Sequence, residues 1–205
     1  MFITFEGVEG CGKSTQIDRL AHYLKDRGLD VVVTREPGGT PVGEAIRTIL
    51  LDPDHTSMSP MTEVLLYAAS RAQHVDQVIR PALDRGAIVI SDRFADSTTA
   101  YQGAARQLGV DLISQVHSMA TRRVWPDLTL VLDLDPRIGM QRVVEKRALD
   151  RLEHEPMDFH DAVRESFVLL AGLEPERMKI VDADRPLEEV EADIRALVEE
   201  ALATA

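Results

Sequence analysis

The chain has 205 residues, of which 44% are hydrophobic and 28% charged, and its 23 cationic and 35 acidic side chains give a formal net charge of −12. This balance argues against a general nucleic-acid-binding protein, which needs a basic surface to displace counterions. A single cysteine rules out an intramolecular disulfide, and no apolar run approaches the length of a membrane span, so we expect a cytoplasmic protein without membrane or nucleic-acid partners.

Short apolar runs rich in β-branched residues recur along the chain and predict strands buried on both faces of a parallel sheet. The predicted strands are residues 2–6, 31–34, 87–92, 128–133 and 179–182. Helical patterns lie between them, and residues 51–60 are rich in turn formers and predict an exposed loop. The alternation predicts one α/β domain over residues 1–205, built on a doubly wound five-stranded parallel sheet in three layers.

The C-terminal segment carries much of the negative charge. Between residues 182 and 205 there are eight acids and two arginines. Apolar residues at spacings of three and four predict an amphipathic helix there, and we interpret its acidic face as a solvated surface.

Residues 7–14 read G-V-E-G-C-G-K-S and fit the pattern G-x-x-x-x-G-K-[ST] between a predicted strand and a predicted helix. In such a loop, backbone N–H groups and the helix N-terminus bind phosphate oxygens, Lys13 reaches the β- and γ-phosphates, and Ser14 holds Mg²⁺. We interpret the Cys11 side chain as a small filler. The predicted ATP site consists of Gly7, Val8, Glu9, Gly10, Cys11, Gly12, Lys13, Ser14 and Thr15.

A phosphate loop alone does not identify a reaction. The chain contains no asparagine, which excludes the N-K-x-D signature of GTPases. A kinase of a small molecule, an ATP-driven switch that recruits a partner, and a non-catalytic ATP-binding scaffold remain open.

Three further segments distinguish among these classes: T-R-E-P-G-G-T at 34–40, D-R-F at 92–94 and D-R-L-E at 150–153. Together with the phosphate loop, they make the chain resemble the bacterial thymidylate kinase family from residue 2 to residue 182. The resemblance implies a P-loop nucleoside monophosphate kinase fold with a helical lid over about residues 142–154, and a homodimer. It also implies transfer of the γ-phosphoryl group of ATP to dTMP, giving dTDP and ADP in dTTP biosynthesis. A kinase of another nucleoside monophosphate or of a deoxynucleoside is the alternative enzyme.

The resemblance also implies a dTMP-binding set. Tyr67 would stack on thymine, Arg71 would donate to the base O4, Thr98 and Gln102 would read the base edge, and Tyr101 would crowd the sugar 2′ position. The full set is Glu9, Arg35, Pro37, Arg47, Tyr67, Arg71, Arg93, Ser97, Thr98, Tyr101 and Gln102.

The acceptor in this reaction is a phosphate oxygen that is already ionised near pH 7. The reaction therefore needs in-line positioning and cationic cover rather than a general base. By resemblance, Arg93 bridges the two phosphate groups, and Asp92 joins Ser14 at Mg²⁺, directly or through water. Arg151 is the leading lid arginine and Arg147 the next, so the catalytic set is Lys13, Asp92, Arg93, Arg147 and Arg151.

Overall fold

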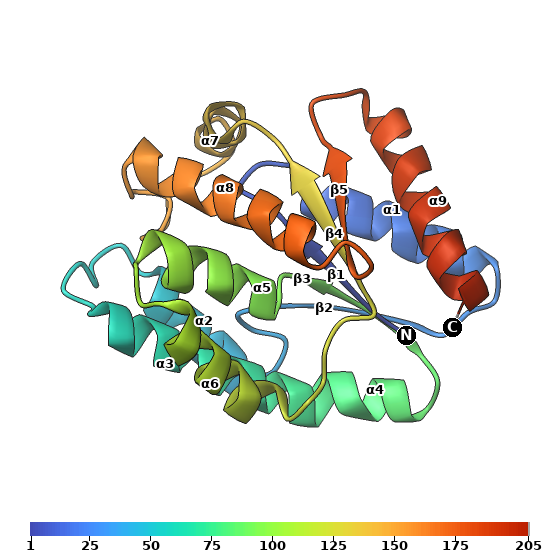
Figure 1. Cartoon of the computed structure of the whole chain (residues 1–205), viewed down its shortest axis with the longest axis horizontal. Helices are drawn as coiled ribbons and strands as arrows, with labels where there is room; N and C mark the ends of the chain where they lie inside the picture. Colours follow the sequence, from blue (N-terminus) through green and yellow to red (C-terminus); the bar gives the residue numbers. More distant parts are fainter. Residues whose placement is uncertain (205) are drawn as a thin grey trace.

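The computed structural model describes residues 1–204 and confirms the predicted α/β class (Figure 1). Its five strands form one sheet in the order β2-β3-β1-β4-β5, and every neighbouring pair is parallel. Each strand begins and ends within one residue of its predicted bounds. The strands are β1 (Phe2–Glu6), β2 (Val31–Arg35), β3 (Ile88–Asp92), β4 (Leu128–Asp133) and β5 (Met178–Asp182).

Helices connect the strands, and local sequence signals set several of their starts. Thr40 accepts a hydrogen bond from the N–H of Gly43 at 2.9 Å, and proline follows it at the first helical position. The helices are α1 (Lys13–Asp26), α2 (Pro41–Leu51), α3 (Pro60–His74), α4 (Arg80–Asp84), α5 (Ala95–Thr98), α6 (Val110–Thr121), α7 (Pro136–Val144), α8 (Met157–Leu173) and α9 (Leu187–Thr204), with π-helical turns η1 (Val75–Ile79) and η2 (Thr99–Ala105).

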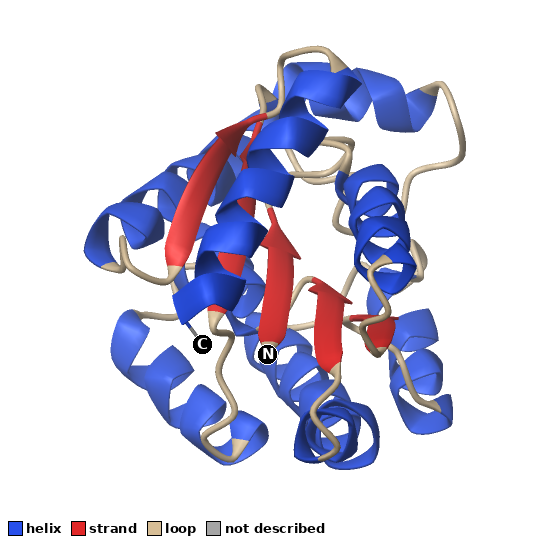
Figure 2. Ribbon diagram, turned by 90° about the vertical axis from the view of Figure 1, so that its right-hand side faces the viewer, coloured by secondary structure: helices blue, strands red, loops and turns tan. Residues whose placement is uncertain are grey.

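The helices cover both faces of the sheet, which gives the three layers. Helices α1 and α9 lie together on one side, and α8 lies across β4 and β5 on the other (Figures 1 and 2). The predicted apolar stripe of α1 is buried in the main core through Ile17, Leu20 and Leu24. No helix among residues 1–204 is long and apolar enough to cross a membrane.

The acidic face of α9 is less solvated than expected. Glu191 pairs with Arg19 of α1, and Glu199 pairs with Arg27 at the end of that helix. Part of the C-terminal negative charge therefore joins α9 to α1 through ion pairs.

The lid segment differs from the predicted helix. Only residues 142–144 are helical, and residues 145–154 form turns and irregular backbone. Asp150 accepts hydrogen bonds from the N–H groups of Leu152 and Glu153 at 3.0 and 3.1 Å, while Glu153 accepts one from the N–H of Asp150 at 2.9 Å. These side chains offer the backbone partners that compete with a helix.

Candidate active site

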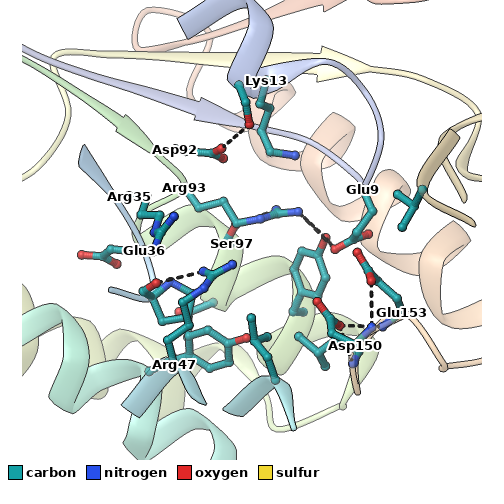
Figure 3. Close-up of a pocket in the computed structure, with 18 of the residues that line it drawn as sticks. Glu9, Lys13, Arg35, Glu36, Arg47, Asp92, Arg93, Ser97, Asp150 and Glu153 are labelled. Carbon is teal, nitrogen blue, oxygen red and sulfur yellow. Dashed lines mark hydrogen bonds and ion pairs between the residues drawn. The ribbon is translucent and has the colours of Figure 1, made fainter. Parts of the chain in front are cut away.

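The strand order brings three loops together at one edge of the sheet. The central strand β1 lies between β3 and β4, and ligands of open parallel sheets bind at the carboxyl ends of the strands near such a switch point. A cavity of about 280 Å³ lies there (Figure 3). Its lining includes five of the seven predicted site cations, Lys13, Arg35, Arg47, Arg93 and Arg147.

The phosphate loop forms one end of this cavity, through Glu9, Gly10, Lys13 and Ser14. Lys13 Nζ donates to the carbonyl oxygens of Gly7 and Val8 at 3.2 and 2.9 Å. The phosphate loop therefore holds the ammonium group of Lys13 against its own backbone. The hydroxyl-bearing residues after it are exposed, whereas Cys11 is buried in the core. Burial of Cys11 supports its interpretation as a filler.

Two glycines let helix α7 lie directly on the phosphate loop. Gly10 has φ +69°, and a Cβ atom on it would lie 2.1 Å from the carbonyl oxygen of Gly139. A Cβ atom on Gly139 would in turn lie 2.1 Å from the carbonyl oxygen of Glu9. Any larger residue at either position would push the loop and α7 apart.

The predicted magnesium ligands lie side by side at the mouth of the loop. Ser14 Oγ donates to Asp92 Oδ2 at 3.2 Å (Figure 3). Both are oxygen ligands, and Mg²⁺ is typically bound by one or two protein oxygens together with substrate phosphates and water. The donor set therefore fits Mg²⁺. No group of three or more His, Cys, Asp or Glu side chains suited to a metal occurs within the described residues.

Arg93 lies between the phosphate loop and the rest of the cavity. Its backbone has φ 71°, a left-handed conformation that non-glycine residues rarely adopt and that the surrounding contacts must stabilise. Nη1 donates to Gly7 O at 2.9 Å and to Ser97 Oγ at 3.1 Å. Nη2 donates to Glu9 Oε1 at 3.1 Å and to the Tyr101 hydroxyl at 3.0 Å. The guanidinium is thus held in one place from several sides.

Two carboxylates beside Arg93 have opposite pKa shifts. Burial and the nearby negative charge of Asp96 raise the pKa of Glu6 to about 7, despite hydrogen bonds to that carboxylate. Burial also acts to raise the pKa of Glu9, but contact with His160 and the charges of Arg93 and Lys13 hold it well below its usual range. Glu9 is therefore a fixed negative charge.

Arg47 lies at the far side of the cavity from the phosphate loop, whereas Arg35 lies beside Asp92, its partner in the neighbouring strand (Figure 3). Arg47 Nη1 donates to the carbonyl oxygen of Pro37 at 2.9 Å, and Arg35 pairs with Glu44 at 3.0 Å. Burial lowers the pKa of Arg47, and the neighbouring positive charge of Arg35 lowers it further. An anion bound between these guanidinium groups would relieve that repulsion.

The predicted base-binding residues fall into two groups. Tyr67, Thr98, Tyr101 and Gln102 line the cavity. Arg71 lies behind this wall and is 1% exposed.

Arg71 is held by several partners. Its Nε donates to Glu36 Oε2 at 2.8 Å, and its Nη2 donates to Thr98 Oγ1 and to the carbonyl oxygen of Phe94, each at 3.0 Å. Nη1 has no hydrogen-bond partner among residues 1–204.

The two lid arginines have different surroundings. Arg147 lines the cavity and forms a two-pronged ion pair with Glu153, at 2.5 and 2.7 Å (Figure 3). Arg151 is buried outside the lining, where its Nε donates to the carbonyl oxygen of Leu50 at 2.8 Å and its Nη2 pairs with Glu63 at 2.6 Å. In this conformation, Arg147 is the lid arginine at the cavity.

Sequence reasoning missed the acids and the histidine that hold these cations. Glu36, Glu63, Glu153 and His160 are all buried. His160 Nδ1 lies 3.6 Å from Glu9 Oε2. The available signals were the positions of Glu36 within T-R-E-P-G-G-T and of Glu153 within D-R-L-E, but nothing local marks Glu63 or His160 as a buried partner.

Comparison with known proteins is consistent across sequence and structure. Residues 5–194 match the family model described as thymidylate kinase. The chain is 52% identical to the thymidylate kinase of Symbiobacterium thermophilum over 98% of this chain and 94% of that protein. It is 50% identical to that of Deinococcus radiodurans over 98% and 97%. Its fold is similar to the crystal structure of thymidylate kinase from Ehrlichia chaffeensis, with a TM-score of 0.79, 33% identity and coverage of 97% of this chain and 98% of that one.

Proposed function

The chain belongs to the thymidylate kinase family, and we propose that it transfers the γ-phosphoryl group of ATP to dTMP, giving dTDP and ADP for dTTP biosynthesis. One observation carries this proposal. A single cavity is lined both by the phosphate loop and by a second pair of cations, Arg35 and Arg47, and Arg93 lies between the loop and Arg47 (Figure 3). A phosphotransferase with a phosphate acceptor needs two such anion sites facing each other.

At the donor end, the loop backbone and Lys13 would bind the ATP phosphates. The present partners of Lys13 Nζ are neutral carbonyl oxygens of Gly7 and Val8. Anionic phosphate oxygens accept stronger hydrogen bonds than carbonyls, so Lys13 would turn toward them when ATP binds. The residues from Gly7 to Thr15 would form the ATP site as their spacing predicts.

Ser14 Oγ and Asp92 would hold Mg²⁺, directly or through water. Held there, the ion would supply positive charge to offset the negative charge that develops during transfer.

At the acceptor end, Arg35 and Arg47 would bind the dTMP phosphate, and Arg93 would contact both reacting phosphates. No carboxylate has to remove a proton, because the attacking phosphate oxygen is already ionised. Glu9 serves instead to hold Arg93 in position through the 3.1 Å ion pair. Fixing the guanidinium before the reaction avoids reorganisation during it.

The base and sugar would occupy the part of the cavity lined by Tyr67, Thr98, Tyr101 and Gln102. Tyr67 offers an aromatic face for stacking. Arg71 Nη1 is a buried N–H donor without a partner among residues 1–204, and a base carbonyl such as the thymine O4 would accept a hydrogen bond from it. Thr98, which accepts a hydrogen bond from Arg71 Nη2, would have to let the base approach this donor. The Tyr101 hydroxyl, bonded to Glu9 at 2.6 Å, would crowd the sugar 2′ position.

Residues 142–154 would act as the lid of a single catalytic domain. In the conformation described, Arg147 is the lid cation at the cavity, and it pairs with Glu153. On lid closure, Arg147 would leave Glu153 and bind phosphate oxygens. For Arg151 to fulfil its predicted role, it would have to leave Glu63 as the lid closes.

A coupled ADP-release assay tests the proposed reaction. The purified chain is given Mg-ATP with dTMP, dUMP, dCMP, dGMP or UMP. We expect rapid ADP formation with dTMP and little without an acceptor. A switch protein would instead show slow ATP hydrolysis stimulated by a protein partner, and dTMP turnover no higher than the blank would contradict the proposal.

A homodimer and a cytoplasmic location are the remaining parts of the proposal. Helices α2 and α3 pack together and expose apolar side chains, including Ile49, Met61 and Leu65. Such a surface is suited to a second copy of the chain. Sedimentation analysis at several concentrations would measure the oligomeric state, and the need for ATP favours the cytoplasm.

A further inference from the structure

Glu63 is a buried carboxylate that lies behind the cavity rather than in its lining. It is 1% exposed and lies in the first turn of α3. Its Oε1 accepts a hydrogen bond from Gln102 Nε2 at 2.9 Å. Arg106 Nε lies 3.3 Å from the same oxygen, and Arg151 Nη2 lies 2.6 Å from Oε2. One carboxylate therefore bonds a cavity-lining amide and two guanidinium groups.

These partners keep Glu63 ionised. Burial acts to raise the pKa of Glu63, but the hydrogen bond from Gln102 and the charge of Arg106 outweigh it and lower the pKa below its usual value. An ionised carboxylate accepts hydrogen bonds and cannot donate them.

The orientation of the Gln102 amide follows from this chemistry. A carboxamide has a donor end and an acceptor end, and facing an ionised carboxylate it must present the donor, Nε2. The amide oxygen Oε1 then lies at the other end of the carboxamide, turned away from the Glu63 oxygen that Nε2 contacts. Because Gln102 lines the cavity, a bound base would meet an acceptor there.

Pyrimidines differ at the ring position that would meet this acceptor. Thymine and uracil carry a donor, N3–H, whereas the N3 atom of cytosine is an acceptor. A buried site built to accept a hydrogen bond rejects a ligand that brings a second acceptor, since both groups lose solvation without gaining a bond. A reversed amide would favour cytosine instead.

We propose that Glu63 is a specificity-determining positioning residue, which selects thymine over cytosine by orienting the Gln102 amide with its oxygen toward the base. The inference rests on the proposed function, because it takes dTMP as the acceptor. It concerns a residue that does not line the cavity and acts only through Gln102.

The test compares kcat/KM for dTMP, dUMP and dCMP in the wild type and in Glu63→Gln. The amide of the variant can donate to Gln102 Oε1 and so let Gln102 turn Nε2 toward the base. We expect the dTMP-to-dCMP ratio to fall at least about tenfold. The dTMP-to-dUMP ratio should stay within about twofold, because both bases carry N3–H. General damage to the site would not separate the two ratios.

Two further variants keep the test independent of folding defects. In the double variant Glu63→Gln, Gln102→Glu, both oxygens at position 102 are acceptors, so the dTMP-to-dCMP ratio should recover to within about threefold of the wild type. Gln102→Leu removes the amide while leaving Glu63 with both arginines, and it should lower that ratio at least about tenfold. It tests the step on which the role of Glu63 depends, namely that the Gln102 amide reads the base, so an unchanged ratio in this variant overturns the inference.

Arg106→Gln is the matched control, because it removes a cation from Glu63 but leaves the bond to Gln102. Its dTMP-to-dCMP ratio should match the wild type. A fall like that of Glu63→Gln would attribute the effect to charge and overturn the inference. So would unchanged ratios in Glu63→Gln and Gln102→Leu with normal dTMP turnover in the wild type. A wild type without dTMP turnover would overturn the proposed function itself, and the inference with it.

Discussion

The phosphate loop with Arg93 and the lid face the same cavity, but they are held by different kinds of contact. Around the loop, the sheet positions the parts: Arg93 directly follows the last residue of β3, and its side chain bonds the carbonyl oxygen of Gly7 as well as Ser97, Glu9 and Tyr101. In the lid, side chains hold the segment, through Glu153 to Arg147 and Glu63 to Arg151. The sheet therefore fixes the loop, whereas a few ion pairs fix the lid.

The difference means that the phosphate loop and Arg93 are positioned before the substrates bind, whereas the lid changes its contacts when they bind. The bonds of Arg93 to Gly7, Ser97, Glu9 and Tyr101 hold its guanidinium group in place before any ligand binds. An arginine such as Arg147 can leave its carboxylate partner, Glu153, for a phosphate group, because two phosphate oxygens can accept the same pair of guanidinium hydrogen bonds. The lid is then the part of the site whose closure depends on the ligands.

The largest expected effect comes from replacing Arg93, which belongs to the fixed part of the site. Arg93→Ala should lower dTMP-dependent kcat by about 10³-fold or more, as removal of an arginine at the transferred phosphoryl group does elsewhere. Arg93→Lys keeps the charge but not the fork that bonds Glu9 and Ser97, so it should restore only part of the activity. Coupled ADP release measures both variants, and a loss below about tenfold in Arg93→Ala would remove Arg93 from the catalytic set.

The lid arginines give the next largest effect and separate two roles. Arg147→Ala should lower kcat by roughly 10²-fold with little change in the thermal midpoint, since Arg147 is the cation at the cavity. Arg151→Ala should instead lower the free energy of unfolding by about 3 kcal/mol, because it leaves Glu63 with one cation fewer. Calorimetry and steady-state kinetics on both variants decide between the roles.

The opposite pattern would have a clear meaning. A larger loss of kcat in Arg151→Ala, at unchanged stability, would assign the catalytic lid role to Arg151, as the D-R-L-E segment predicts. Arg151 would then exchange Glu63 for phosphate when the lid closes.

The smallest expected effect is the pH dependence of the contact between His160 and Glu9, which belongs to the fixed part of the site. Burial acts to lower the pKa of His160, but the contact with Glu9 outweighs it, so the pKa is raised above 6.5. A raised histidine pKa contributes stability that is full below pH 6.5 and is lost as pH rises through the folded-state value. The wild type should therefore lose stability relative to His160→Gln as the pH rises above 6.5.

The thermal midpoint and the KM for dTMP are measured for both proteins as a function of pH. The KM of His160→Gln should differ from that of the wild type by less than about tenfold, because Arg93 still holds Glu9. The charged groups that face His160 are Glu9 on the loop and Glu155 directly after the lid. Parallel pH profiles of the two proteins would show that the pair does not position Glu9.

Sequence patterns predicted the fixed region well for a physical reason. Strands buried on both faces are continuous apolar runs, so β1 and β4 were located to the residue. The phosphate loop needs glycines and a lysine at set spacings, and these too are local. Because parallel strands place their carboxyl ends together, the convergence of Asp92 and Ser14 followed from topology.

The lid and the buried acids were not predictable in the same way. Glu63 looks like any acid in the first turn of a helix, where the dipole favours it. Its burial depends on Arg106 and Arg151, which arrive from distant segments. The alternating charges of residues 142–154 suit a surface helix, and only Asp150, whose side chain bonds the backbone two residues on, signalled a turn.

The contact between Gly10 and Gly139 sets a boundary for engineering. Because no side chain fits between the loop and α7, these two elements form one unit that must be exchanged or kept together. A lid taken from another nucleotide kinase should therefore be joined after Val144, the end of α7, and not before Pro136. Chimeras with the later junction keep the donor site intact, but the transplanted turn must still provide an arginine at position 151 to pair with the buried Glu63.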